Sequence, residues 1–536
     1  MPVLEAKIRP GSSEFERRRE HMLGLLRRVR ELEGKVRANS ERARPKFEKR
    51  CQLLPRTRIE RLVDSNRPFF EVSTLAGLHM HDDDGDANAS GGGVIAGLGW
   101  VAGVRCVITA SDSGIKGGAI TPMGLKKSLR AQEIAALNNL PVVNLIESAG
   151  ANLLYQSESF IEGGAVFRNL ARLSARGLPV VTVVHGSSTA GGAYMPGLSD
   201  YVVVVRGRSK IFLAGPPLLR AATGEIANDE ELGGADMHST LTGTAEFIAE
   251  TDAHAIDLAR EVVGKLGWPE LREQREFTPP RYSPEELVGI VPDDPKKPYD
   301  VREVIARLVD GSDFLDFKAS YGAATVCGKA AIEGITVGLI GNNGPIDAQG
   351  ATKAAQFIQL CCQSESPIIY LQNTTGYMVG KDAEHGGIVK HGSKMIQAVS
   401  NATVPQLTLL IGASYGAGNY GMCGRGFEPR FIFAWPNNRT AVMGGEQAAG
   451  VMAIITEAKL ARMGQELNRD ALAVMQKGII DQIDRESTAF YATARLWDDG
   501  IIDPRDSRRI LATCLRICDE SKRRTPRPNT FGVGRM

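Results

Sequence analysis

The sequence repeats one pattern twice, 226 residues apart. The segment VVTVVHGSSTAGGAYMP (180–196) ends an apolar run in a turn of small residues, and QLTLLIGASYGAGNYGM (406–422) does so again. The same shift places Gly150 on Gly376 and Lys127 on Lys353. A single offset that fits three separated pieces predicts two domains of one fold, because it is far longer than a solenoid repeat.

The junction between the two copies is rich in proline and charge, in FTPPRYSPEELVGIVPDDPKKPYD (277–300). We therefore expect domains at 1–285 and 295–536. Within each copy, short apolar runs alternate with amphipathic segments, which predicts parallel βαβ units in an α/β fold. Ligands in such sheets bind beyond the carboxyl ends of the strands, where the small-residue turns fall.

Composition excludes several classes of function. With 64 Lys and Arg against 62 Asp and Glu, the chain lacks the basic excess of a nucleic-acid binder. Residues 14–36 have apolar positions every three or four residues, which predicts a long amphipathic helix. The sequence has neither an apolar run of membrane-spanning length nor a signal-peptide core, so we expect a cytoplasmic protein without membrane contact. The eight cysteines form no metal-site spacing and are expected to be buried free thiols. The acidic stretch at 81–86 is expected to be a solvated loop, so no metal is expected.

Two familiar motifs overlap in the second small-residue turn. Gly412–Gly416 matches the G-x-S-x-G nucleophile elbow, but no histidine follows Ser414, so a hydrolase of the usual triad order is excluded. Gly416–Gly421 matches the dinucleotide fingerprint, but residues 436–445 lack the acidic residue that would bind the ribose. No Walker A motif is present, so the chain shows no means of using ATP.

What both turns share is a pair of small residues after a buried strand: Gly191-Gly192 and Ala417-Gly418. Backbone N–H groups at the start of a helix lack intrahelical partners and can bind negative charge. Such pairs make oxyanion holes, and two copies favour two developing oxyanions. A tight strand-to-helix crossing that merely needs glycine is the alternative for either turn alone. Neither turn contains a Glu, Asp or His that would serve as a general base.

A series of ordered motifs runs from about residue 15 to the C-terminus: RCQLLPRTRIERLVD, GGGVIAGLGWVAG, IKGGAITPMGLKKSLRAQEIA, STAGGAYMPGLSDYVVVV, IFLAGPPLLRAATGE, ELGGADMHS, GNNGPI, FIQLCCQ, GASYGAGNYGMCGR, MGGEQAA and WDDGIIDPRDSR. With these motifs the chain resembles the carboxyltransferase (β) subunits of biotin-dependent acyl-CoA carboxylases, most closely the geranyl-CoA and 3-methylcrotonyl-CoA enzymes. This resemblance implies two crotonase-like (ClpP/crotonase) domains related by internal duplication.

The resemblance also accounts for the missing base. In this family the carboxyl group arrives on biotin, and the ureido anion left after CO2 loss takes the substrate proton. By resemblance, Gly191 and Gly192 bind the thioester enolate, and Ala417 and Gly418 bind the ureido oxygen. The resemblance further assigns substrate binding to Ala149, Gly150, Gly163, Lys126, Lys127 and Arg130, and biotin binding to Thr375, Gly376, Tyr377 and Tyr415. The family pattern DSGGAN reads ESAGAN here, so the departure at Ala149 leaves a backbone contact from that turn open.

The chain has no M-K-M biotin-acceptor sequence. The resemblance therefore implies that biotin is carried by a partner α subunit, which also holds the biotin carboxylase, and that none is bound covalently here. It implies β-subunit dimers within a β6 core, and an α6β6 holoenzyme.

One position favours geranyl-CoA over methylcrotonyl-CoA. Methylcrotonyl-specific relatives have a bulky aromatic residue in a loop before the helix that corresponds to VFRNLARLS, and this chain has Gly163 there, in a loop expected to be shorter. The missing side chain opens space for an extra isoprenyl unit. A turn that needs a glycine with positive φ is the alternative explanation. A methylcrotonyl-CoA, propionyl-CoA or other acyl-CoA carboxylase subunit, a crotonase-type hydratase or isomerase, and a related decarboxylase remain alternative functions.

Overall fold

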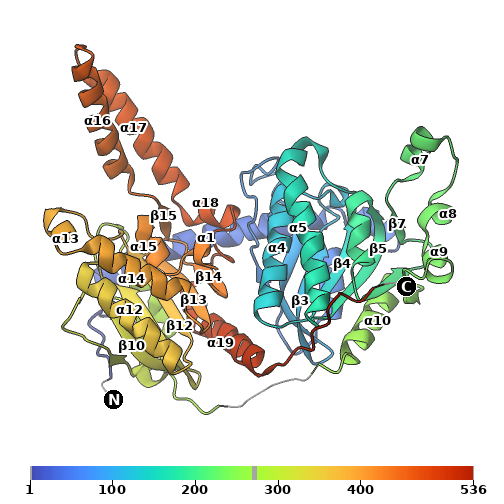
Figure 1. Ribbon diagram of the computed structural model, residues 1–536, viewed down its shortest axis with the longest axis horizontal. Coiled ribbons are helices and arrows are strands. Elements are labelled where there is room, and N and C mark those ends of the chain that lie inside the picture. Colours follow the sequence, from blue (N-terminus) through green and yellow to red (C-terminus); the bar gives the residue numbers. More distant parts are fainter. Residues whose placement is uncertain (1–2, 269–274, 535–536) are drawn as a thin grey trace. The chain divides into compact units, whose positions relative to one another are not determined.

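The computed structural model describes residues 3–268 and 275–534 as two compact units, each built on one sheet (Figure 1). One unit contains residues 31–273, 494–496 and 519–536, and we call it the N-unit. The other contains residues 1–30, 274–493 and 497–518, and we call it the C-unit. Among the described residues, no helix is both long enough and apolar enough to cross a membrane.

The sheet of the N-unit has the order β1-β2-β3-β4-β5-β6-β8, with β7 beside β5. The pairs among β1, β2 and β3 are antiparallel, and all pairs from β3 onward are parallel. Its strands are β1 (Phe70–Val72), β2 (Val94–Val101), β3 (Val104–Ser111), β4 (Val142–Ser148), β5 (Val180–Thr189), β6 (Tyr201–Val205), β7 (Lys210–Phe212) and β8 (Phe247–Ala249).

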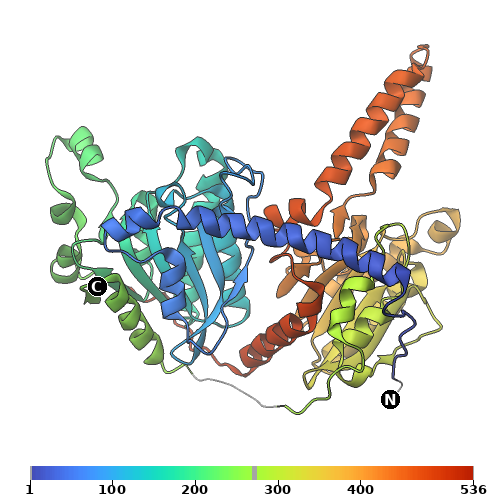
Figure 2. The ribbon, with the colours of Figure 1, turned by 180° about the vertical axis from the view of Figure 1, so that it is seen from behind.

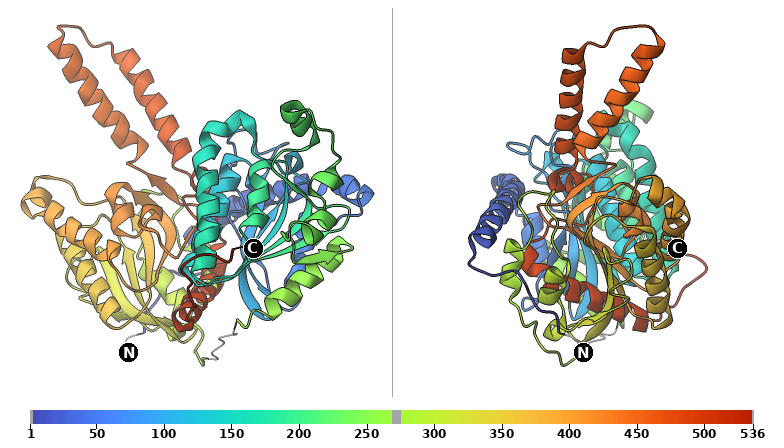
Figure 3. Two further views of the ribbon diagram at one scale, coloured as in Figure 1. Left: turned by 45° about the vertical axis from the view of Figure 1, so that its right-hand side comes forward. Right: turned by 90° about the vertical axis from the view of Figure 1, so that its left-hand side faces the viewer.

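Helices cover both faces of this sheet. α3 and α10 pack their apolar side chains on one face, in a core that includes Ile59, Val183 and Ile256. α4 and α5 lie side by side on the other face (Figure 3). The helices of this unit are α2 (Arg44–Lys49), α3 (Pro55–Leu62), α4 (Pro122–Leu137), α5 (Gln156–Ala175), α6 (Tyr194–Gly197), α7 (Pro216–Thr223), α8 (Asp229–Gly233), α9 (Ala235–Thr240) and α10 (Asp252–Gly264).

The sheet of the C-unit has the order β14-β13-β12-β11-β10-β9, with β15 beside β13, and is parallel from β11 onward. Its strands are β9 (Leu315–Asp316), β10 (Thr325–Ile332), β11 (Ile335–Asn342), β12 (Ile368–Thr374), β13 (Gln406–Tyr415), β14 (Phe431–Ala434) and β15 (Arg439–Ala441). The helices beyond α10 are α11 (Arg302–Leu308), α12 (Ala348–Gln363), α13 (Lys381–His385), α14 (Ile388–Ser400), α15 (Gly416–Gly421), α16 (Gly445–Arg462), α17 (Arg469–Glu486), α18 (Ala489–Ala494) and α19 (Ser507–Arg523).

The duplication is confirmed residue by residue. α4 and α12, β4 and β12, and β5 and β13 begin and end 226 positions apart. Even the helix starts agree, because the side chains of Thr121 and Asp347 each accept a hydrogen bond from the glycine N–H three residues on. Both copies also shift register at the end of their central strand, between Ile146 and Ser148 in β4 and at the equivalent place in β12.

Two segments account for most of the difference between the compact units and the contiguous division at 1–285 and 295–536. The first is α1 (Ser13–Glu41), the predicted amphipathic helix, which is one continuous helix (Figure 2). Its residues up to Arg30 are grouped with the C-unit and those from Glu31 with the N-unit. At about 1.5 Å per residue the helix is roughly 44 Å long, which exceeds the ~30 Å of a small domain. The second is the C-terminal segment from Asp519, which joins the N-unit through a buried two-point ion pair of Arg105 with Glu520, at 3.0 and 2.9 Å.

Candidate active site

The first small-residue turn follows β5 directly. Ala190 to Ala193 form a 3-10 turn in which Gly191 is exposed and Gly192 is buried. Ala190 has a φ of +51°, a left-handed conformation that L-residues with a Cβ adopt only at a cost. This turn reverses the chain so that the N–H groups of the following residues begin a new helical segment without intrahelical acceptors.

A second turn of the N-unit, at the end of β4, lies against the first. The Ser148 Oγ accepts a hydrogen bond from the Gly150 N–H at 3.1 Å, which leaves Ala149 exposed at the tip. A Cβ on Gly192 would lie 3.2 Å from the Ser148 Oγ, and a Cβ on Gly150 would lie 3.7 Å from that of Ala190. The structure therefore brings the two predicted turns of this copy together.

The C-unit repeats this arrangement. Ala417 is exposed and Gly418 is buried in the first turn of α15, and Gly416 has a φ of +55° at the position that corresponds to Ala190. The Gly376 N–H donates to the Thr374 Oγ1 at 3.2 Å. A Cβ on Gly418 would lie only 2.8 Å from the Gly376 Cα. Here too the two turns touch, and only glycine allows this approach.

The predicted biotin residues do not all face the same way. Thr375 is exposed at the tip of its turn, as Ala149 is in the other copy. Tyr377 instead points toward α14, where its OH donates to the Gly392 carbonyl at 3.5 Å, and burial raises its pKa to about 12. Tyr415 is half-buried, and burial raises the pKa of its phenol as well. Tyr377 therefore packs against α14 in this structure, and its contact with biotin stays a prediction.

Ser414 is not placed as a nucleophile. Its hydroxyl is fully buried and donates to the Gln372 Oε1 at 2.5 Å, while Asn419 Nδ2 donates to it at 2.7 Å. No histidine or carboxylate is among these partners. The hydrogen bonds agree with the exclusion of a hydrolase.

Two of the three predicted CoA contacts on α4 are buried, which the sequence did not anticipate. Lys127 is 1% exposed and donates to the Gly91 carbonyl at 3.3 Å, and burial lowers its pKa to about 8. Arg130 is 3% exposed and pairs with Glu133 at 2.9 Å. Neither side chain is exposed in this structure, and their contact with CoA phosphates stays a prediction. Lys126 is exposed.

The position of Gly163 also corrects an expectation. It does not lie in a loop with positive φ but inside α5. A Cβ there would meet no atom within 4 Å. Phe167 lies one turn further along the same face, 3.5 Å from a Cβ built on Gly191, and its ring stacks obliquely on Tyr194 at 5.6 Å between centroids. Gly163 thus leaves open space one helical turn from Phe167, which borders the first small-residue turn.

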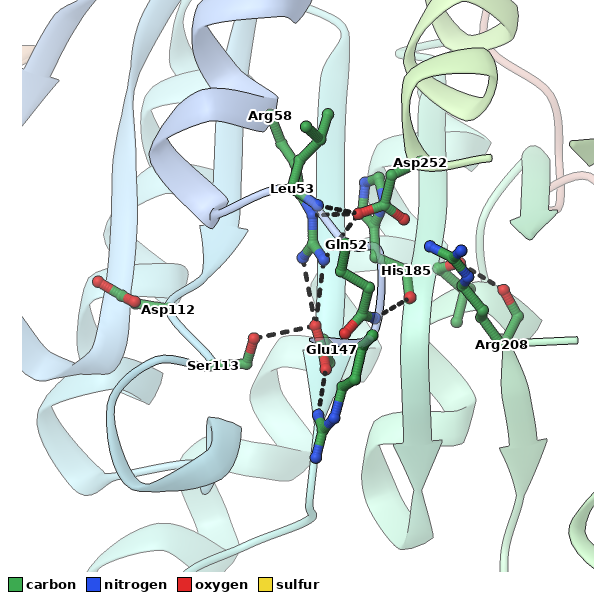
Figure 4. Close-up of polar contacts among 12 residues, drawn as sticks. Gln52, Leu53, Arg58, Asp112, Ser113, Glu147, His185, Arg208 and Asp252 are labelled. Atoms are coloured by element: carbon green, nitrogen blue, oxygen red, sulfur yellow. Dashed lines mark hydrogen bonds and ion pairs between the residues drawn. The ribbon is translucent and has the colours of Figure 1, made fainter. Parts of the chain in front are cut away.

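Sequence reasoning missed a buried polar cluster beneath the first turn, which joins Arg58, Glu147, His185 and Asp252 (Figure 4). The available signal was an ionisable residue within each of two apolar strands, Glu147 in VVNLIES and His185 in VVTVVHG. The cysteine prediction holds for six buried free thiols, whereas Cys362 is half-buried and Cys51 is exposed.

Comparison with known proteins agrees with this geometry. The family model for the carboxyl transferase domain matches residues 46–531. Over its full length the chain is 46% identical to a probable biotin-dependent acyl-coenzyme A carboxylase beta2 subunit of Mycobacterium tuberculosis, which is covered completely. It is 45% identical to the mitochondrial methylcrotonoyl-CoA carboxylase beta chain of Dictyostelium discoideum, with 91% of that protein covered.

Among solved structures, the beta subunit of P. aeruginosa geranyl-CoA carboxylase matches with a TM-score of 0.94 and 57% identity, and both chains are covered completely. These matches extend over both copies and include both pairs of turns. The chain therefore belongs to the carboxyl transferase family, as a carboxyltransferase subunit of the biotin-dependent acyl-CoA carboxylases.

Proposed function

We propose that this subunit transfers a carboxyl group from biotin on a partner chain to the γ-carbon of geranyl-CoA. The observation that supports the choice of substrate is the open space at Gly163 in α5. Gly163 lies one helical turn before Phe167, and Phe167 borders the turn that contains Gly191. The 57% identity to a geranyl-CoA carboxylase subunit supports it, compared with 45% to a methylcrotonoyl-CoA carboxylase chain. Methylcrotonyl-CoA is the second candidate, since relatives with that name also match over the full chain.

The proposed roles follow from where negative charge develops. Removing a γ-proton from a 3-methyl-2-enoyl thioester delocalises charge through the double bond to the thioester oxygen. In the proposal, the N–H groups of Gly191 and Gly192 donate to that oxygen. Each such donor contributes about 3–4 kcal/mol when it is aimed at the charge of the transition state. The turn of Ser148 to Gly150 holds these groups in place from the neighbouring strand.

The small-residue turn of the C-unit, which contains Ala417 and Gly418, would receive carboxylated biotin. This group would supply CO2 and, after losing it, a base for the substrate proton. The residues fit this group, because Ala417 and Thr375 are exposed and Gly418 leaves no side chain in the way. A cavity of about 230 Å³ adjoins α15 and is lined in part by Gly416, Tyr420 and Trp497. In the proposal, the N–H groups of Ala417 and Gly418 donate to the ureido oxygen, so that no side chain has to move the proton.

The remaining expectations belong to the same proposal. Biotin, its carrier domain and the ATP-using carboxylase would belong to an α subunit, and the β subunits would assemble into a β6 core within an α6β6 complex. The two domains at 1–285 and 295–536 would serve acyl-CoA and biotin respectively. Lys126 would contact CoA, and the complex would be cytoplasmic.

The first prediction concerns the partner. We expect the purified chain to show no ATP-dependent carboxylation of acyl-CoA, and to gain it when a biotinylated α subunit is added. Incorporation of labelled bicarbonate into the acyl-CoA measures this. Carboxylation by the chain alone would contradict the proposal. If the reconstituted complex carboxylates methylcrotonyl-CoA but not geranyl-CoA, then methylcrotonyl-CoA is the substrate.

The second prediction concerns Gly163. We expect Gly163→Phe to lower kcat/KM for geranyl-CoA by on the order of 100-fold, because burial of several CH2 groups at about 0.8 kcal/mol each is lost. The value for methylcrotonyl-CoA should change by less than about threefold. Gly164→Phe is the matched control, since its Cβ also meets no atom within 4 Å but lies one residue around the helix. Equal losses for both substrates would place the acyl pocket elsewhere.

A further inference from the structure

A buried charge cluster joins four elements of the N-unit beneath the first oxyanion turn (Figure 4). Arg58 of α3 is its centre, with a side chain 1% exposed. Its Nη1 and Nη2 both lie 3.3 Å from the Glu147 Oε2 at the end of β4. Its Nε and Nη2 lie 3.1 and 3.0 Å from the Asp252 Oδ2 at the start of α10. The Asp252 Oδ1 in turn is 3.0 Å from the Nδ1 of His185 in β5.

Burial and the neighbouring groups shift the pKa values of His185 and Asp252. Burial lowers the pKa of His185 to about 4, so the imidazole is neutral. Although burial alone would raise it, the pKa of Asp252 is lowered to about 2 by the hydrogen bond from His185 and by the charge of Arg58. One guanidinium thus binds two carboxylates inside the unit, and Arg50 lies 3.7 Å from the second oxygen of Glu147. Breaking such a pair leaves an uncompensated buried charge.

The cluster is linked to the Ser148–Gly150 turn because Glu147 immediately precedes that turn. Ser148 is the next residue, and its side chain holds the Gly150 N–H and lies against Gly192. The Glu147 carboxyl also lies against β5, since a Cβ on Gly186 would be 2.8 Å from the Glu147 Cδ. Ser113 adds a hydrogen bond to the Glu147 Oε2 at 2.9 Å. Glu147 is therefore fixed from three directions one residue before the turn.

The second copy lacks this cluster at the corresponding positions. The 226-residue shift places Asn373 on Glu147 and Ile411 on His185. Next to Asn373 the C-unit has a cavity of about 160 Å³, which is also lined by Gly412 and Ala413. The two copies share strands, turns and glycines, but only the first fixes the residue before its turn with buried charge. The difference therefore does not follow from the fold itself.

We propose that Arg58 and Glu147 are positioning residues that hold the Ser148–Gly150 turn against Gly192, and so set the oxyanion hole of the N-unit but not that of the C-unit. This inference rests on the proposed function for its kinetic test. Neither side chain touches the acyl-CoA in this account. They act through the turn, so their loss should lower kcat while substrate binding changes little.

The test is Glu147→Gln in the complex with a biotinylated α subunit. The amide retains the size of the side chain, and Arg58 keeps Asp252 as a partner, so the variant can fold. Glu520→Gln is the matched control, because Glu520 is a buried glutamate of the same unit that binds Arg105 and is not connected to the turn. We expect kcat for acyl-CoA carboxylation to fall roughly 30- to 100-fold in Glu147→Gln, as small misplacements of catalytic groups do, with KM changed less than threefold. Glu520→Gln should stay within about twofold of the wild type.

Amide hydrogen exchange gives a second readout that does not depend on turnover. Residues 148–155 should exchange faster in Glu147→Gln than in the wild type, and the corresponding residues 374–381 should not change. Equal kcat in the two variants, or unchanged exchange at 148–155, would overturn the positioning role. Absence of carboxylation in the wild-type complex would instead reject the proposed function, while the exchange result would still decide the inference.

Discussion

Gly418→Val should abolish most of the carboxyl transfer, with kcat reduced by about 10²- to 10³-fold, the usual cost of losing an oxyanion donor. The reason is geometric. A Cβ at this position would lie 2.8 Å from the Gly376 Cα and 2.9 Å from the Thr374 Cγ2. The nearest atom belongs to the backbone, so the two turns of the C-unit must separate. The N–H groups of Ala417 and Gly418 would then no longer point at the ureido oxygen. Uncoupled ATP hydrolysis by the complex without acyl-CoA, which reports the loss of CO2 from biotin, should fall with it.

Gly478→Val is the control for this experiment. Gly478 lies in α17 of the same unit, and a Cβ there would meet no atom within 4 Å. Valine has a higher helix propensity than glycine, so we expect this variant to fold and to keep kcat within about threefold of the wild type. Unchanged turnover in Gly418→Val would remove Gly418 from the site.

Gly192→Val should impair the carboxylation of acyl-CoA but not the loss of CO2 from carboxylated biotin. Its Cβ would meet the Ser148 Oγ at 3.2 Å and the Ser188 Oγ at 3.4 Å, so the neighbours are side-chain atoms and not backbone. The added methyl groups displace Ser148 and with it the Gly150 turn. We expect carboxylation of acyl-CoA to fall about 100-fold, while uncoupled ATP hydrolysis without acyl-CoA stays near the wild-type rate.

The alanine variants of both glycines sharpen this comparison. Gly192→Ala should be milder than Gly418→Ala, because a serine hydroxyl can rotate away and a backbone Cα cannot. Gly197→Val is the control in the N-unit, since its Cβ would also meet no atom within 4 Å. An equal fall of both half-reactions in Gly192→Val would contradict the assignment of one turn to each oxyanion.

The duplicated strands and turns were predictable because their signal is local. Apolar runs and glycine positions recur at one spacing, and strand ends 226 residues apart in the structure confirm it for β4 and β12. The same is true of Gly191, Gly192, Ala417 and Gly418, which lie in the first turn after a buried strand in each copy. The positions of the glycines predict these turns because two turns that approach so closely leave no room for a Cβ.

The errors concern side chains whose surroundings come from distant parts of the chain. Lys127 has the sequence pattern of a surface lysine at a helix start, but its side chain is buried and donates to the Gly91 carbonyl. The sequence predicts a loop at Gly163, but in the structure α5 continues through this residue. Arg58, Glu147 and Asp252 are separated by up to 194 residues, and no local pattern indicates that they meet.

The most direct test is a structure of the assembled complex with an acyl-CoA and biotin bound together. The account predicts that the thioester oxygen lies about 2.7–3.1 Å from the N–H nitrogens of Gly191 and Gly192. The ureido oxygen of biotin should lie at a similar distance from those of Ala417 and Gly418 of whichever subunit completes the site. Both ligands bound with these four nitrogens directed away from the two oxygens would contradict it.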